Sequence, residues 1–118
     1  MRNLAPEIFR QRLLVEGRYT GEVTRERLTA YLLGVAAHLD LKAYGEPTLY
    51  SPAGLGKAEN QGFDAFLPLI DSGIAAYVWS SAKFFSIVLY TCKGFDAQAA
   101  VGYTLEFFGA SEVESLAF

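Results

Sequence analysis

The spacing of hydrophobic and polar positions along the chain predicts two helices. After Thr24, a residue type that caps helix N-termini, leucine and valine recur every three or four positions, so residues 24–40 are predicted to form a helix. A second amphipathic stretch begins after Asp96, another capping residue type. It stops at Gly109, where a left-handed backbone would end a helix.

Short apolar runs bounded by glycine, proline and polar residues predict the strands. They cover residues 10–19, 43–51, 63–70, 73–79, 83–92 and 112–118. The runs at 73–79 and 83–92 are predicted to form a hairpin around "SSA". Because proline cannot donate to a ladder, Pro47 favours an edge position or a strand start, and Pro68 favours an edge position or a bulge. Residues 51–62 carry one proline and three glycines and are predicted to be a long loop.

This order of elements predicts an α+β fold in which both helices cover one face of an antiparallel sheet. A strand with one solvated face should alternate between apolar and polar residues, but "KFFSIVLYT" is apolar on both sides. The face without helices would then expose a large apolar patch. We therefore expect a homodimer with sheets packed face to face or edge to edge. Alternatively, a loose N-terminal tail (residues 1–9) or the 51–62 loop covers that face.

Composition narrows the class of protein. A chain of 118 residues is one domain by length, and 52% hydrophobic residues with nine Phe and seven Tyr supply a dense core. The net charge of −3 disfavours nucleic acid as a partner. One cysteine excludes an internal disulfide. The sequence contains neither an apolar run of about 20 residues for a membrane span nor a secretory h-region. A soluble, cytoplasmic protein is expected.

The chain offers few residues for nucleophilic or metal chemistry. Cys92 ends a strand next to Lys93, a cation that would favour the reactive thiolate, although an inert core cysteine is the alternative. The only histidine, His38, lies near a helix end, where a cation is favoured. Histidine, cysteine and carboxylate groups do not occur at metal-ligand spacing.

Carboxylates on strands and turns give one further candidate site. Glu16 could pair with Asp64 or with Asp71, in the manner of acid–base pairs, but solvated carboxylates are the alternative.

The stretch "DSGIAAYVWSSAKFFSIVLYTC" (71–92) and the element order resemble the prokaryotic S-adenosylmethionine decarboxylases. In that family a hairpin reads approximately Glu-Ser-His-x-Ser-x-His-Thr-x-Pro-Glu, and the next strand ends in Thr-Cys. Without gaps, Glu-Ser falls on Asp71 and Ser72, the aromatic residue before Pro-Glu falls on Trp79, and Thr-Cys falls on Thr91 and Cys92. The flanks "RLLVEGRY" and "FDAQAAVGYTLEFFGA" also resemble the family, so the resemblance spans about residues 11–115.

The resemblance implies a role in polyamine (spermidine) biosynthesis and a self-made cofactor. In the family, the serine hydroxyl attacks the preceding carbonyl, and the chain is cleaved to leave a pyruvoyl group that serves as electron sink. By position, cleavage would fall between Asp71 and Ser72, the pyruvoyl group would derive from Ser72, and Cys92 would protonate the product.

Several family positions are changed here. The histidine that drives the elimination falls on Tyr77, and a phenol is a poor base near neutral pH. The histidine after the serine falls on Gly73, and a second serine that assists processing falls on Asp64. The Pro-Glu whose carboxylate holds the substrate ribose falls on Ser80 and Ser81, which removes a charge-assisted contact.

Two interpretations follow. In the first, the chain is a divergent, unprocessed homologue without a cofactor, which binds a small-molecule ligand, a second copy or a related decarboxylase-like chain. In the second, it is an active pyruvoyl-dependent decarboxylase of S-adenosylmethionine or another amino-acid-like substrate, with His38 or Asp64 assisting cleavage. The substrate-side candidates are Glu16, Asp64, Trp79 and Ser81. Chance could also place Ser72 and Cys92 at this spacing.

Overall fold

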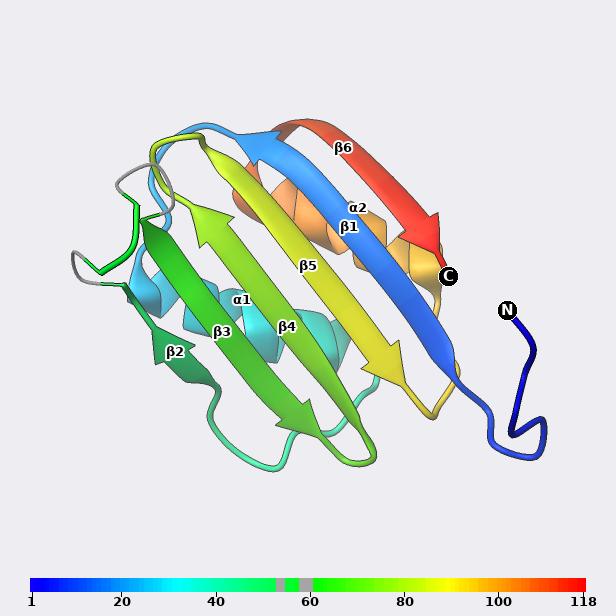
Figure 1. The fold of residues 1–118 in the computed structure, drawn as a ribbon. Helices are drawn as coiled ribbons and strands as arrows, with labels where there is room; N and C mark the ends of the chain where they lie inside the picture. Colours follow the sequence, from blue (N-terminus) through cyan, green and yellow to red (C-terminus); the bar gives the residue numbers. More distant parts are fainter. Residues whose placement is uncertain (53–54, 58–60) are drawn as a thin grey trace.

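A computed structural model describes residues 1–52, 55–57 and 61–118 and shows a single sheet backed by helices (Figure 1). The elements in chain order are β1 (Gln11–Tyr19), α1 (Arg25–His38), β2 (Thr48–Tyr50), β3 (Gly62–Leu69), β4 (Ser72–Trp79), β5 (Phe84–Thr91), α2 (Ala97–Phe108) and β6 (Ala110–Ala117). The last strand is longer than predicted. The 51–62 loop lies partly outside the described residues.

The six strands pair in the order β2-β3-β4-β5-β1-β6, and every neighbouring pair is antiparallel. Tight turns join β3 to β4 and β4 to β5, so these three strands are neighbours both in sequence and in the sheet. Helix α2 returns the chain to the far side of β1, where β6 pairs. The predicted α+β fold and the β4–β5 hairpin are confirmed.

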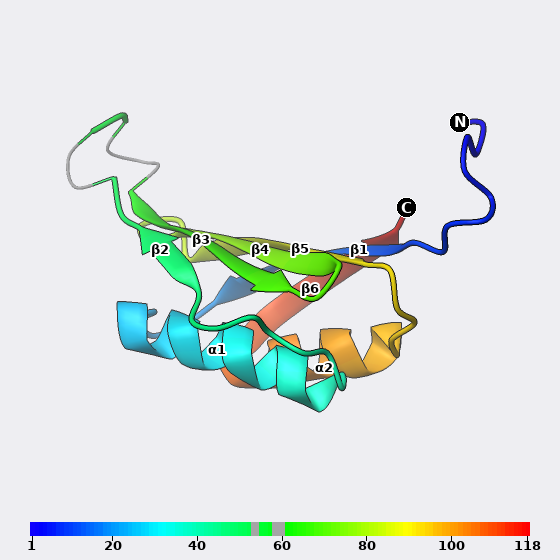
Figure 2. The same cartoon turned by 90° about the horizontal axis from the view of Figure 1, so that it is seen from below.

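Both helices cover the same face of the sheet, as Figure 2 shows. The side chain of Thr24 caps α1 by accepting a hydrogen bond from the Arg27 amide, and Asp96 caps α2 in the same way through Ala99. Gly109 ends α2 with φ 57°, in the left-handed region that favours glycine. Each of these caps was predicted from the sequence.

The core lies between the sheet and the helices. Along β1, β4 and β5, every second side chain points toward the helices and is buried, including Val15, Ile74 and Ile87. The α2 residue Phe108 stacks on Phe85 and contacts Tyr31, with ring centroids 4.6 and 4.8 Å apart respectively. Burial raises the pKa of the Tyr31 phenol, whose hydroxyl lies 2.7 Å from the Thr104 hydroxyl. Aromatic packing therefore fixes both helices to one side of the sheet.

The edge position expected for the strand with Pro68 is wrong, because β3 lies between β2 and β4. The proline is tolerated because β2 is only three residues long and pairs no further than Phe66. The Pro68 carbonyl accepts a hydrogen bond from the Tyr44 amide on the β2 side. Since both backbone groups of a strand residue point to the same side, the missing N–H faces the segment at Tyr44 beyond the end of β2, and the β3–β4 ladder loses no hydrogen bond.

The opposite side of the sheet, termed here the open face, carries no helix (Figure 2). Its side chains include exposed aromatic residues, among them Phe66, Tyr77 and Tyr90. The N-terminal residues do not cover it: they leave the sheet at the start of β1 and project away from it in both views. In the described parts of the chain, no helix is long and apolar enough to cross a membrane.

Alanine substitutions at two glycines test the packing of the strands and of α2. At Gly62, an added Cβ would lie 1.7 Å from the Val78 carbonyl oxygen, so we expect Gly62→Ala to lower the free energy of unfolding by about 1–3 kcal/mol. Gly102 in α2 has open space around it, so Gly102→Ala should raise stability by about 1 kcal/mol through helix propensity. Urea denaturation of both variants measures the changes; equal effects at the two positions would contradict the packing described.

Candidate functional site

Ser72 and Cys92, twenty positions apart in the chain, lie side by side at one end of the sheet. Ser72 opens β4, and Cys92 directly follows β5, whose residue Tyr90 pairs with Gly73. The Cys92 amide donates a hydrogen bond of 3.1 Å to the Ser72 hydroxyl oxygen. Antiparallel pairing thus brings the start of one strand to the end of the next.

Asp71 lies in the two-residue turn between β3 and β4. Its φ of 58° is in the left-handed region, which aspartate tolerates better than most residues. The side chain is exposed. The Asp71–Ser72 peptide is therefore at a tight, solvent-accessible turn.

A cavity of about 360 Å³ adjoins Ser72 and Cys92, a size typical of small-molecule sites. It is lined by Asp40, Leu41, Lys42, Leu69, Ile70, Asp71, Ser72, Cys92 and Lys93. Asp40, Leu41 and Lys42 come from the segment that leaves α1, so the cavity joins the sheet end to the helix layer. The sequence gives no signal for these three residues as part of a site, because nothing in a connecting segment indicates where it packs.

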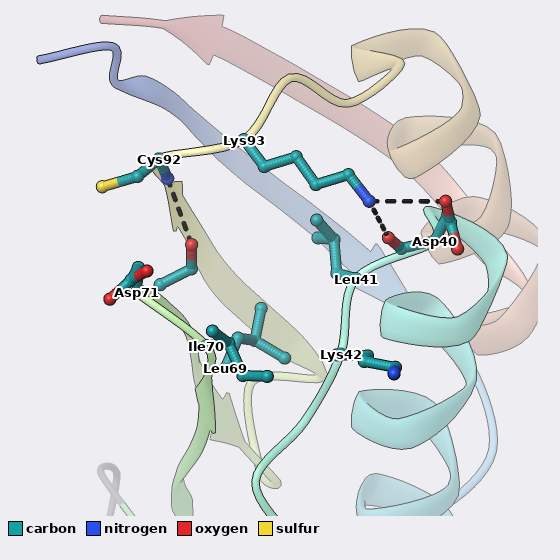
Figure 3. A pocket seen from close by; sticks show the side chains of 9 residues that line it. Asp40, Leu41, Lys42, Leu69, Ile70, Asp71, Cys92 and Lys93 are labelled. Carbon is teal, nitrogen blue, oxygen red and sulfur yellow. Dashed lines mark hydrogen bonds and ion pairs between the residues drawn. The ribbon is translucent and has the colours of Figure 1, made fainter.

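The ammonium group of Lys93 contacts Asp40 and not the thiol of Cys92. Its ammonium group donates to the Asp40 backbone carbonyl at 2.7 Å and lies 3.3 Å from the Asp40 carboxylate. Figure 3 shows the Lys93 side chain reaching toward α1 while the Cys92 sulfur points the other way. The expected activation of Cys92 by Lys93 therefore has no support in this geometry, and the contact instead ties the β5 end to the end of α1.

A second group of candidates forms a row across the middle of the open face. Tyr77 pairs with Asp64 on one side and with Ser86 on the other. The Ser86 hydroxyl donates a 2.6 Å hydrogen bond to the Glu16 carboxylate. Tyr77 is five residues along β4 from Ser72, about 16 Å at the usual strand rise. Within one chain, this row is out of reach of the Ser72 hydroxyl.

The remaining candidates lie farther away. Trp79 is at the other end of β4, where its ring contacts Phe84 at a centroid distance of 5.3 Å, and Ser81 is in the following turn. His38 lies on the helix side, against Tyr103 at 5.1 Å. The structure therefore gathers Asp71, Ser72 and Cys92 and separates them from the other predicted residues.

The lining residues of the cavity carry a hydroxyl, carboxylates and two ammonium groups, and they include leucine and isoleucine. Such a lining suits a small ligand with both polar and apolar parts. No histidine is among the lining residues. Among the described residues, no group of three His, Cys, Asp or Glu side chains could hold a metal ion.

The chain is similar to known proteins in sequence and in fold. Residues 23–118 match the family model described as S-adenosylmethionine decarboxylase. The structure is similar to the crystal structure of the adenosylmethionine decarboxylase from Aquifex aeolicus VF5, with a TM-score of 0.73 and 14% sequence identity over 94% of this chain and 89% of that chain. No curated protein sequence matches the chain. At this identity, the structural likeness shows the fold.

The contact between Ser72 and Cys92 can be measured directly. In Ser72→Ala, the Cys92 amide loses its acceptor, so its hydrogen exchange in the native state should accelerate about fivefold, the effect of roughly one net hydrogen bond. Ser86→Ala is the matched control, because its hydroxyl bonds Glu16 in the middle of the sheet. Unchanged exchange at Cys92 in Ser72→Ala would contradict the contact.

Proposed function

Since this chain belongs to the S-adenosylmethionine decarboxylase family, we propose that it is a divergent member that does not cleave itself and that binds a ligand or a partner chain. The Ser72 hydroxyl carries this proposal. It accepts a hydrogen bond from the Cys92 amide, and no imidazole lines the cavity beside it. The family position of the processing base holds Tyr77, whose side chain lies on the open face with Asp64.

Loss of processing removes the chemistry together with the cofactor. A serine that stays within the chain provides no pyruvoyl carbonyl, so a substrate amine has no group with which to form a Schiff base. Catalytic groups that act as a unit lose their effect when one of them is lost, so the others are no longer needed. This fits the replacement of the family residues at three positions, Gly73, Tyr77 and Ser81. A binding role for the cavity beside Ser72 needs none of these groups.

The alternative is an active pyruvoyl-dependent decarboxylase that cleaves at Asp71–Ser72. The observation in its favour is that Ser72 and Cys92, the two family positions retained, lie in contact at one cavity. Asp71 in its left-handed turn would be the residue before the cleaved bond. This activity would require a base other than an imidazole at the cavity.

Intact-mass spectrometry of the purified protein separates the two functions. We expect one species at the full-chain mass of 12.9 kDa, identical in behaviour to a Ser72→Ala control that cannot form the ester. Two fragments divided between Asp71 and Ser72, with a pyruvoyl mass on the C-terminal one, would overturn the proposal and establish the alternative.

We further propose that the partner is a second copy of this chain, packed on the open face. Exposed Phe66, Tyr77 and Tyr90 are spread over three neighbouring strands there, and Ala75 and Val88 lie between them. An apolar area of this extent on a sheet without a covering layer is typical of an interface. A related decarboxylase-like chain is the other candidate partner.

Val88→Lys tests this interface, because Val88 is near the centre of the open face. Burying an unpaired ammonium group is costly, so the variant should sediment as a monomer where the parent protein sediments as a dimer. Leu105→Lys places the same charge on an exposed position of α2, on the other side of the sheet, and should remain dimeric. A monomeric parent protein, or two variants that behave alike, would refute the open-face dimer.

A further inference from the structure

Residues 1–9, termed here the arm, expose apolar side chains that find no partner within the chain's core. Leu4 is 79% exposed, Ile8 51% and Phe9 56%. The arm is not a structureless end, because Asn3 accepts hydrogen bonds from the Ala5 amide and the Arg10 guanidinium. The Ile8 amide donates to the Ala5 carbonyl and closes a turn. An ordered segment with outward apolar side chains is typical of a segment that contacts another surface.

The arm departs on the side of the open face. Figure 2 shows it rising from the start of β1, away from the helices, to the level that a second layer would occupy. It starts at the end of the sheet that holds Cys92, since Gln11 pairs with Thr91. Phe9 lies near Gly94, just beyond Cys92, which anchors the base of the arm there.

A hollow on the open face lies at the same end of the sheet. Its volume is about 370 Å³, and it is lined by Phe66, Asp71, Ser72, Gly73, Ala75, Val88 and Tyr90. Its walls are largely apolar, and Phe66 and Tyr90 remain 48% and 42% exposed. Ser72 therefore stands between two spaces: the cavity toward α1 and this hollow on the open face.

The strand order relates the arm to the hollow through symmetry. In the order β2-β3-β4-β5-β1-β6, a two-fold axis parallel to the strands and placed at the centre of the order, between β4 and β5, would lay β1 over β3 of a facing copy. Such an axis keeps equivalent strand ends together. An arm leaving the start of β1 then meets the end of the partner's β3, where Phe66 and the turn at Asp71 border the hollow.

We propose that the arm of each protomer packs into the hollow beside Ser72 of the partner subunit. This inference rests on the homodimer in the proposed function. Leu4 and Ile8 supply apolar side chains for an apolar hollow, and Arg2 supplies a positive charge opposite the one charged residue of the lining, Asp71. The exchange covers two exposed apolar surfaces of the chain at once.

The first measurement is the dimer dissociation constant from sedimentation equilibrium. In Leu4→Ser with Ile8→Ser, the loss of two apolar contacts per arm should raise this constant about tenfold or more. Leu105→Ser is the matched control, with an exposed leucine of α2 replaced by the same residue, and should leave the constant unchanged. An unchanged constant in the arm variant overturns the arm exchange while the open-face dimer stands.

The second measurement shows whether the arm reaches the partner or its own chain. Leu4→Cys and Phe66→Cys are made separately, each with Cys92→Ser, and the two proteins are mixed and treated with a short bismaleimide. A cross-linked two-chain species that contains one of each protein is the expected result. A third protein that carries Leu4→Cys, Phe66→Cys and Cys92→Ser in one chain reports linkage within the chain. If only this third protein is linked, internally, or if the parent protein is a monomer, the proposal is overturned. Self-cleavage in the mass experiment would leave this outcome unaffected.

Discussion

The antiparallel pairing of β4 with β5 is the constraint on which the rest of the molecule depends. Its register sets Gly73 against Tyr90, which puts Ser72 in contact with the Cys92 amide. The same register sets Tyr77 against Ser86, which places these groups in the middle of the sheet. A shift of one residue would exchange the two faces of the strand and bury the polar row against the helices. One ladder thus determines both which groups meet and which stay apart.

The second constraint is that two helices can cover only one side of a six-stranded sheet. The core on the helix side is closed by aromatic packing of Phe108 on Phe85 and Tyr31, which leaves the open face without a layer. The helix side also supplies a wall of the cavity, because Asp40 and its neighbours meet the sheet end through Lys93. The site therefore lies where the sheet, the helix layer and the uncovered face come together, and Ser72 borders both sides.

Much of the fold could be predicted, because local patterns fixed it. Thr24, Asp96 and Gly109 mark helix ends through groups that act within a few residues, and the structure has each of them in that role. Pro68 was misjudged because its tolerance depends on the length of a different strand, β2, which the residues around Pro68 do not report. Lys93 was misjudged because adjacency in sequence does not set the direction of a long side chain, and its partner Asp40 is fifty-three positions away.

Local sequence patterns were enough to predict the α+β class, the caps, the hairpin and, through residue types and spacing, the family of the chain. It did so because capping, periodicity and turn chemistry act over a few neighbouring residues. The folded chain was needed to see that Asp71, Ser72 and Cys92 share a cavity with Asp40 and Lys42, and that Asp64, Tyr77 and Glu16 form a separate row. Those relations depend on strand register and on where a connecting segment packs, and both are set by long-range burial of apolar side chains.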